Sequence, residues 1–238
     1  MTTKLTLTAG TAGALLIASS AIAGPIAVDF RGTGLGQSAR VSFASGDSAA
    51  FSERNLFVGQ LRHRLGTGAS AKDFLTYCID LTQYAGDGTF NLVALHDAPV
   101  TSPAPSNKWE LNHGQIDALN SLYNAYGEAV DSNAKASAFQ AAVWEIVFDW
   151  STVDGGTFTA ANETNLRTGV VSISNKISNA LFTDYLNAAV DGADTTGRLA
   201  AIVSATRQDQ IIVLPLPGAG ALAGAGMLVL GARRRRSM

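Results

Sequence analysis

The chain has one cysteine, Cys78, within the stretch Tyr77 to Asp80 (YCID). A single cysteine excludes an internal disulfide and any multi-cysteine zinc or iron–sulfur site. Four roles remain open for its thiol: an inert buried group, half of an intermolecular disulfide, a catalytic nucleophile, or a thiol bonded to an atom other than sulfur. The choice depends on the groups that the fold places beside it.

A catalytic cysteine needs a base, and the candidates are His63, His96 and His113. None of them stands in a recognisable cysteine-protease context, and their spacing matches no metal-binding motif. We therefore expect surface or loop histidines. We also expect no metal, no cofactor and no turnover enzyme.

A second stretch, Phe139 to Trp144 (FQAAVW), lies 62 residues further on, counted from Cys78 to Gln140. Together the two stretches resemble the motifs of thioester domains in bacterial surface adhesins. In that family a Cys in an aromatic-Cys-aliphatic-polar motif is bonded to the side chain of a Gln on a helix, and a Trp often follows that Gln. The resemblance covers roughly residues 70–150 by motif. It implies a thioester between Cys78 and Gln140, with Trp144 close by.

The chemistry of that family explains the residue types. The thiolate attacks the glutamine amide carbonyl and expels ammonia, which requires both groups in near-attack geometry because an amide is a poor acyl donor. We expect Tyr77, Asp80, Phe139 and Trp144 to form the environment of the bond, with the aromatic side chains excluding water. Asp80 and Glu145 flank the two stretches; they are either supporting groups around the bond or, as we expect, surface carboxylates.

An incoming amine, or less readily a hydroxyl, would then displace Cys78 and stay joined to Gln140, as in a single-use covalent tether. The alternative is an inert buried Cys78, since small apolar cysteines are commonly buried without a function. The chain would then be a noncovalent structural or glycan-binding component of an extracellular matrix.

The N-terminal residues 1–23 read as a secretory signal peptide. Lys4 supplies the positive start, the apolar stretch follows, and Ala21 and Ala23 form a small-x-small cleavage site.

The C-terminal residues 214–238 read as a sorting signal. Pro215, Leu216 and Pro217 precede an uncharged segment that is long enough, with the residues before it, to span a bilayer. The cluster Arg233, Arg234, Arg235 and Arg236 is expected on the cytoplasmic side. This arrangement resembles exosortase-type sorting signals (PEP-CTERM, here closest to its Val-Pro-Leu-Pro-Ala form). It implies an exosortase-like processing enzyme as partner, transient insertion of residues 214–232 in the inner membrane, and delivery to the cell surface or the medium.

The charge distribution supports this division. Five of the 17 basic residues lie in the two ends, which have no acidic residue. Residues 24–213 therefore hold 12 basic and all 19 acidic residues, a net charge of −7. The 15% charged fraction is well below the ~25% of an average domain. This composition excludes a disordered chain and a general nucleic-acid binder, so we expect no nucleic acid as partner.

For residues 24–213 we predict one α+β domain. A β-rich, sandwich- or barrel-like part should come first, with strand patterns at 39–43, 55–65 and 74–81. Three helices should be inserted after Asn112, the second over about 134–150 and the third over about 160–190. A final hairpin, Leu199 to Ala205 and Gln210 to Val213, should rejoin the sheet.

Overall fold

The computed structural model describes residues 25–44, 50–66, 68, 71–101, 108–149, 166–174, 176–192 and 194–214. Its strands are β1 (Ile26–Phe43), β2 (Phe51–Leu65), β3 (Lys72–Cys78), β4 (Gly88–Ala94), β5 (Val100–Thr101), β6 (Lys108–Trp109), β7 (Val171–Ile173), β8 (Leu199–Val203) and β9 (Gln210–Val213). Its helices are α1 (His113–Tyr126), α2 (Asn133–Phe148) and α4 (Asn179–Asp191), with 3-10 turns η2 (Leu95–Asp97) and η3 (Gly127–Ala129). The described chain is α+β, as the sequence predicts.

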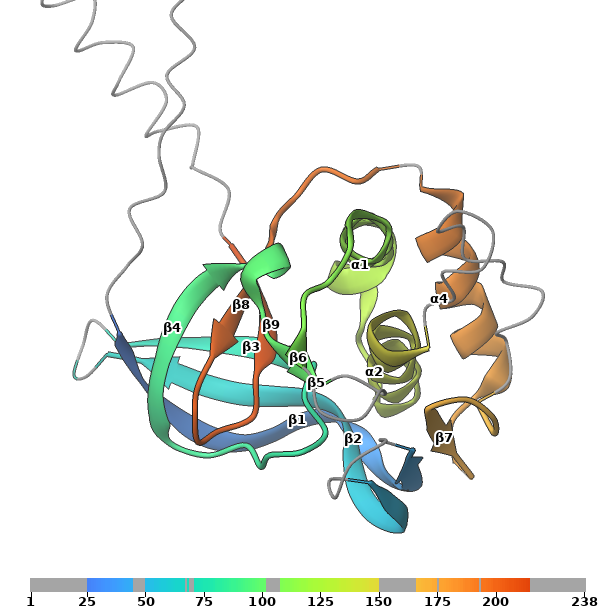
Figure 1. Ribbon diagram of the computed structural model, residues 1–238, viewed down its shortest axis with the longest axis horizontal. Coiled ribbons are helices and arrows are strands. Elements are labelled where there is room, and N and C mark those ends of the chain that lie inside the picture. Colours follow the sequence, from blue (N-terminus) through green and yellow to red (C-terminus); the bar gives the residue numbers. More distant parts are fainter. Residues whose placement is uncertain are drawn as a thin grey trace, which may run out of the picture.

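Six strands pair into a closed antiparallel ring in the order β1-β2-β3-β9-β8-β4, with β4 pairing back onto the start of β1. The 18 residues of β1 are enough to pair with β4 at one end and with β2 along most of the strand. The far end of β1 also pairs with β7. Figure 1 shows the ring strands on one side of the molecule and the helices on the other.

The strands β1 and β2 approach each other most closely where Gly36 pairs with Gly59. Their φ angles are 150° and 151°, a region that favours glycine. A Cβ on Gly59 would lie 2.3 Å from the carbonyl oxygen of Leu35, and a Cβ on Gly36 would lie 2.5 Å from that of Val58. Only two glycines fit this crossing, which lies beside the register shifts of β1.

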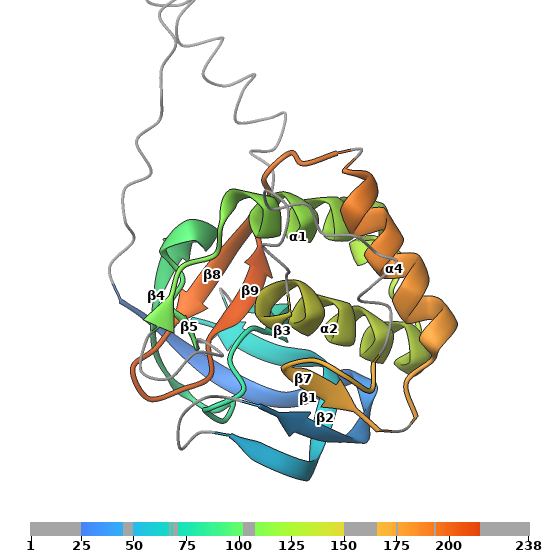
Figure 2. The same cartoon turned by 45° about the vertical axis from the view of Figure 1, so that its right-hand side comes forward.

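Helix α2 is the central helix of the molecule. Ser132 caps its start by accepting a hydrogen bond from the Lys135 N–H, and every residue from Ala136 to Phe148 is buried. It contacts β1, β2 and β3 on one side and α1 and α4 on the other, an arrangement visible in Figure 2. Strand and helix residues share one large core cluster, so the helices and the sheet form one unit and not two subdomains.

The first helix has the start that its sequence indicates. Asn112 and Gln115 form a reciprocal capping box, each side chain accepting from the other's backbone N–H. The Gln115 side-chain amide also donates to the carbonyl oxygens of Ile146 and Val147. This glutamine therefore fixes the start of α1 against the end of α2.

The predicted third helix is too long at its N-terminal end. Helix α4 begins only at Asn179, and Val171 to Ile173 form the strand β7 instead. Val171 and Ile173 are buried with Ser172 between them, a strand alternation that favours pairing with β1. The Asp149 carboxylate after α2 accepts the backbone N–H groups of Val170 and Val171, which directs the chain into this strand.

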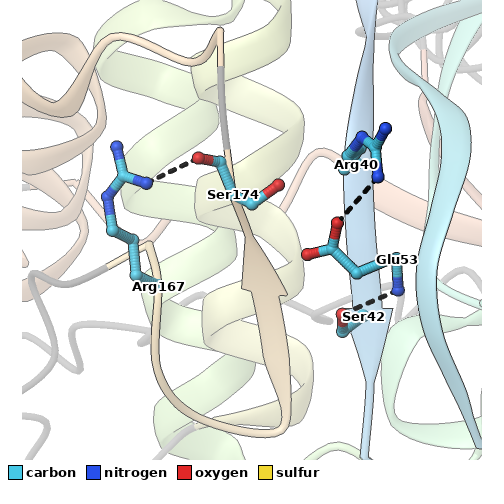
Figure 3. A network of polar contacts seen from close by, with 5 residues as sticks. All are labelled: Arg40, Ser42, Glu53, Arg167 and Ser174. Atoms are coloured by element: carbon cyan, nitrogen blue, oxygen red, sulfur yellow. Dashed lines mark hydrogen bonds and ion pairs between the residues drawn. The ribbon is translucent and has the colours of Figure 1, made fainter.

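Exposed polar contacts join the ends of these strands (Figure 3). The Arg40 guanidinium on β1 lies 3.1 Å from the Glu53 carboxylate on β2, and the Glu53 N–H donates to the Ser42 hydroxyl. Arg167 donates to the carbonyl oxygen of Ser174 at 2.5 Å. Because these groups are solvent-exposed, each ion pair contributes only about 0–1 kcal/mol.

The predicted signal peptide and sorting signal lie outside the described residues, including Ala21, Ala23, Pro215 to Pro217 and the arginine cluster. Among the residues that are described, no helix is both long and apolar enough to cross a membrane.

Candidate functional site: the Cys78–Gln140 pair

The structure brings Cys78 and Gln140 into direct contact. The Cys78 N–H donates to the Gln140 Oε1 at 2.8 Å, and the Gln140 Nε2 donates to the Cys78 carbonyl oxygen at 2.9 Å. Cys78 is the last residue of β3, and Gln140 lies midway along α2. Both are almost fully buried, at 4% and 1% exposure. The amide group is thus fixed beside the residue that carries the thiol.

A pocket of about 230 Å³ leads to this pair. Cys78, Gln140 and Trp144 line it, and so do Arg54 and Tyr84. Tyr84 is 75% exposed and Arg54 is exposed, so the pocket reaches from the surface to the buried pair. The walls between combine apolar residues, Phe30, Phe51, Leu56, Phe57, Leu61 and Leu81, with polar ones, Thr33, Thr82, Gln83 and Gln208.

The thiol of Cys78 is held in its neutral form. Burial, followed by the negative charge of Asp80, raises the pKa of Cys78 well above its ordinary value. The Cys78 Sγ–H donates to the Asp80 carbonyl oxygen at 2.8 Å. The thiol is free, with no disulfide partner in the described part of the chain.

The indole N–H of Trp144 is the unsatisfied donor of the site. It is buried with no acceptor at hydrogen-bond geometry among the described residues. The N–H nonetheless lies close enough to the Cys78 thiol for its dipole to oppose part of the rise in the pKa of Cys78. A buried donor without a partner costs free energy, so its position beside a reactive atom is informative.

The aromatic neighbours predicted for the bond are present. The Tyr77 and Phe139 rings pack with centroids 4.6 Å apart, and the Tyr77 hydroxyl accepts from the Gln60 side chain at 3.1 Å. Phe139 also packs against Tyr123 and Tyr185. These rings are part of the same core cluster as Cys78.

The sequence predicts that the two flanking carboxylates lie at the surface, and this prediction is wrong. Asp80 and Glu145 are each only 3% exposed. Asp80 Oδ1 accepts from both the N–H and the hydroxyl of Thr82 at 2.7 Å, which turns the chain at the end of β3. The side chain satisfies a local turn of the backbone, and this permits its burial.

Several residues of the site have no signal in the sequence. Gln208, between β8 and β9, donates to the carbonyl oxygens of Asp80 and Gln83 and so fixes the loop after Cys78. Arg54 stacks over the Phe51 ring, 4.6 Å from its centroid, at the mouth of the pocket. They lie far from both motifs in the chain, and only the closed ring of strands brings them there.

The histidines do not join this site. His63, expected at the surface, is fully buried between the rings of Phe30 and Phe74, at centroid distances of 5.4 and 5.7 Å. Its strand neighbours Arg62 and Arg64 face the other side, as the alternation of β2 predicts. Among the described residues, no group of three or more His, Cys, Asp or Glu side chains is placed to hold a metal ion.

Comparison with known proteins finds no matching family model, no matching curated protein and no matching solved structure.

Proposed function

We propose that this chain is an exported surface or matrix protein in which Cys78 and Gln140 form an intramolecular thioester. The observation that carries the proposal is the reciprocal pair of hydrogen bonds between the Gln140 amide and the backbone of Cys78. These bonds satisfy the backbone at residue 78, and they also hold the amide beside the only cysteine of the chain. The resemblance to thioester domains gives that placement a chemical role.

The same contacts suit the bond-forming step. The Cys78 sulfur attacks the Gln140 Cδ, and its proton passes to the Nε2 as the C–N bond breaks and ammonia leaves. The Cys78 N–H already donates to the Oε1, where negative charge develops during the attack. The buried thiol is neutral, which makes the reaction slow. A slow step is sufficient because each molecule forms the bond once.

The pocket suits the second step. A nucleophile entering past Tyr84 reaches the acyl carbon of Gln140 and forms an amide or an ester as the C–S bond breaks, and its proton passes to the Cys78 sulfur, which leaves as a neutral thiol. The unsatisfied N–H of Trp144 is placed to donate to that sulfur while negative charge develops on it. Burial of Cys78 and Gln140 at the inner end of the pocket limits access of water to the bond, which slows its hydrolysis while it awaits a partner.

The predicted termini give this chemistry a location. The signal peptide would export the domain through the inner membrane, and an exosortase-like enzyme would process the sorting signal. The domain would then meet partners with free amines or hydroxyls at the cell surface or in the matrix. On this proposal it is an adhesive tether and not an enzyme, because each molecule reacts once.

Capture of a small amine tests the proposal. The full chain, purified in mild detergent, is incubated with methylamine, and its peptides are analysed by mass spectrometry. We expect the amine to be incorporated at Gln140 alone and the Cys78 thiol to become free in the same molecules. Cys78→Ser is the matched control and should incorporate none. Absence of incorporation, or incorporation that does not require Cys78, would support the inert cysteine and a noncovalent role.

A further inference from the structure

A second hollow, of about 350 Å³, lies on the outer surface of β1, β2 and β3. Its lining consists of Arg31, Arg62, Arg64, Asp73, Phe74 and Leu75; we call it the arginine groove. Phe30 and Leu61, the chain neighbours of Arg31 and Arg62, line the reactive pocket instead. Because side chains alternate along a strand, the groove and the reactive pocket lie on opposite faces of β1 and β2.

The charges in the arginine groove are not balanced. Arg64 makes a two-pronged ion pair with Asp73, at 2.6 and 2.9 Å. Within the described chain, neither Arg31 nor Arg62 has a carboxylate within ion-pair distance. Both nonetheless lie near Asp73, since each lowers the pKa of that carboxyl. Asp29, opposite Arg64 in the β1–β2 pair, also acts on Arg64, so three guanidinium groups face two acids and the groove keeps a net positive charge, in a segment whose net charge is −7.

The guanidinium groups are oriented as well as concentrated. Arg62 Nη2 donates to the carbonyl oxygen of Arg31 at 3.1 Å, which positions its side chain without neutralising the charge. The Asp73 pair does the same for Arg64. Oriented guanidinium groups bind planar anions such as carboxylates through paired hydrogen bonds. Beside them Leu75, the partner of Arg62 in the β2–β3 pair, is 48% exposed and adds an apolar surface.

We propose that the arginine groove binds a carboxylate-bearing oligosaccharide, such as a segment of an acidic polysaccharide. Its carboxylates would pair with Arg31 and Arg62, and the apolar face of a sugar ring would pack on Leu75. A noncovalent site of this kind is independent of the thioester, since it lies on another face and uses none of the same residues.

Two other anionic partners fit less well. Nucleic-acid binding that depends on the phosphate backbone uses about 6–10 phosphate contacts. Polybasic membrane-binding segments have about 4–8 lysines or arginines. The arginine groove has three arginines, one of them paired, in a segment that is acidic elsewhere. Such a small and recessed site favours a short ligand with few charges over an extended phosphate surface.

Binding of galacturonate oligomers tests this inference. Their methyl esters, which keep the sugar rings but have no charge, are the control ligands. The full chain in mild detergent is titrated with each oligomer, with mixed micelles containing phosphatidylglycerol, and with single-stranded DNA. We expect binding of the free acid but not of the ester, and weaker binding as salt rises. Arg31→Gln with Arg62→Gln should weaken it about tenfold or more, from the loss of charge-assisted hydrogen bonds.

Arg40→Gln is the control, because Arg40 lies on the same strand, is exposed and is paired with Glu53 away from the groove; it should leave the affinity unchanged. Cys78→Ser should also bind normally, which separates this inference from the thioester. The inference is overturned if the acid does not bind, if the ester binds equally, or if the double variant binds as well as the parent. Tighter binding of the lipid or the DNA through the same arginines would equally overturn it.

Discussion

The side-chain amide of Gln140 takes the place of a neighbouring strand beside Cys78. Strand β2 pairs with β3 only as far as Thr76, and β9 pairs with the other edge of β3 at Tyr77 and Cys78. At residue 78 the backbone N–H and carbonyl are instead satisfied by the amide of Gln140. The side-chain carbonyl of Gln140 is therefore located by hydrogen bonds to the backbone, which hold it more rigidly than side-chain packing alone.

Removal of the Gln140 amide should destabilise the fold. In the Cys78→Ser background, where the amide stays intact, Gln140→Leu leaves a buried N–H and a buried carbonyl at residue 78 without partners. Each such group costs about 1–3 kcal/mol. Urea unfolding of the two proteins should show a loss in that range or above it. An unchanged midpoint would mean that the two hydrogen bonds contribute no stability.

Trp144→Phe tests the role of the unsatisfied indole N–H. This change keeps an aromatic ring but removes the donor beside the Cys78 sulfur. On the thioester proposal, a hydrogen bond to the departing sulfur is lost, which corresponds to about a tenfold slower rate of methylamine incorporation. The rate is followed by intact mass at several times. A rate equal to that of the parent would show that the indole N–H does not assist departure of the sulfur.

Stability should fall as the pH decreases, because of His63. Burial lowers the pKa of His63 below its ordinary value of 6.5, while Gln210 and Asp87 oppose this in part. The unfolded chain then binds a proton that the folded chain does not. The stabilising contribution is complete above pH about 6.5 and is lost as the pH falls through the folded-state pKa. His63→Phe should flatten this part of the melting-temperature profile; an equally steep profile would assign the effect to another group.

Gly59→Ala should be among the most damaging single substitutions. An added Cβ overlaps the backbone of Leu35 and Gly36, and the φ of 151° is strained for alanine. We expect a loss of about 3 kcal/mol or more in the free energy of unfolding. Gly68→Ala is the control, with a φ of 65° but no atom within 4 Å of the added Cβ. It should cost only about 1 kcal/mol, and similar losses at both sites would contradict the close crossing of β1 and β2.

The sequence predicts the strand and the helix that carry Cys78 and Gln140 better than it predicts the tertiary contacts that enclose these two residues. The strand through Cys78 is predicted by its aromatic and β-branched residues, and the helix through Gln140 by its apolar spacing. Both elements are present, with ends within a few residues of those predicted. The final hairpin also forms as expected. The third helix was misjudged because apolar spacing at Val170 and Ile173 fits a helix or a short strand, and pairing with β1 decides between them.

Burial of polar side chains was the main point that the sequence did not reveal. His63, Asp80 and Glu145 read as surface residues, yet all are buried. Asp80 is buried because it satisfies a turn, and His63 because β2 directs it between two aromatic rings. The ring partners of His63 lie on β1 and β3, so the local pattern carries no information about them, whereas Thr82, the partner of Asp80, lies only two residues further on.

The most direct test of the thioester is the mass of the protein itself. The full chain and its Cys78→Ser variant are purified in parallel, and their peptides are measured without added amines. We predict that the parent yields the Cys78 and Gln140 peptides joined, with a mass about 17 Da below their sum, the mass of the ammonia expelled in acyl transfer. The variant should yield the two peptides separately and at full mass. Separate peptides from the parent, with an intact amide at Gln140 and a free thiol at Cys78, would contradict the proposal.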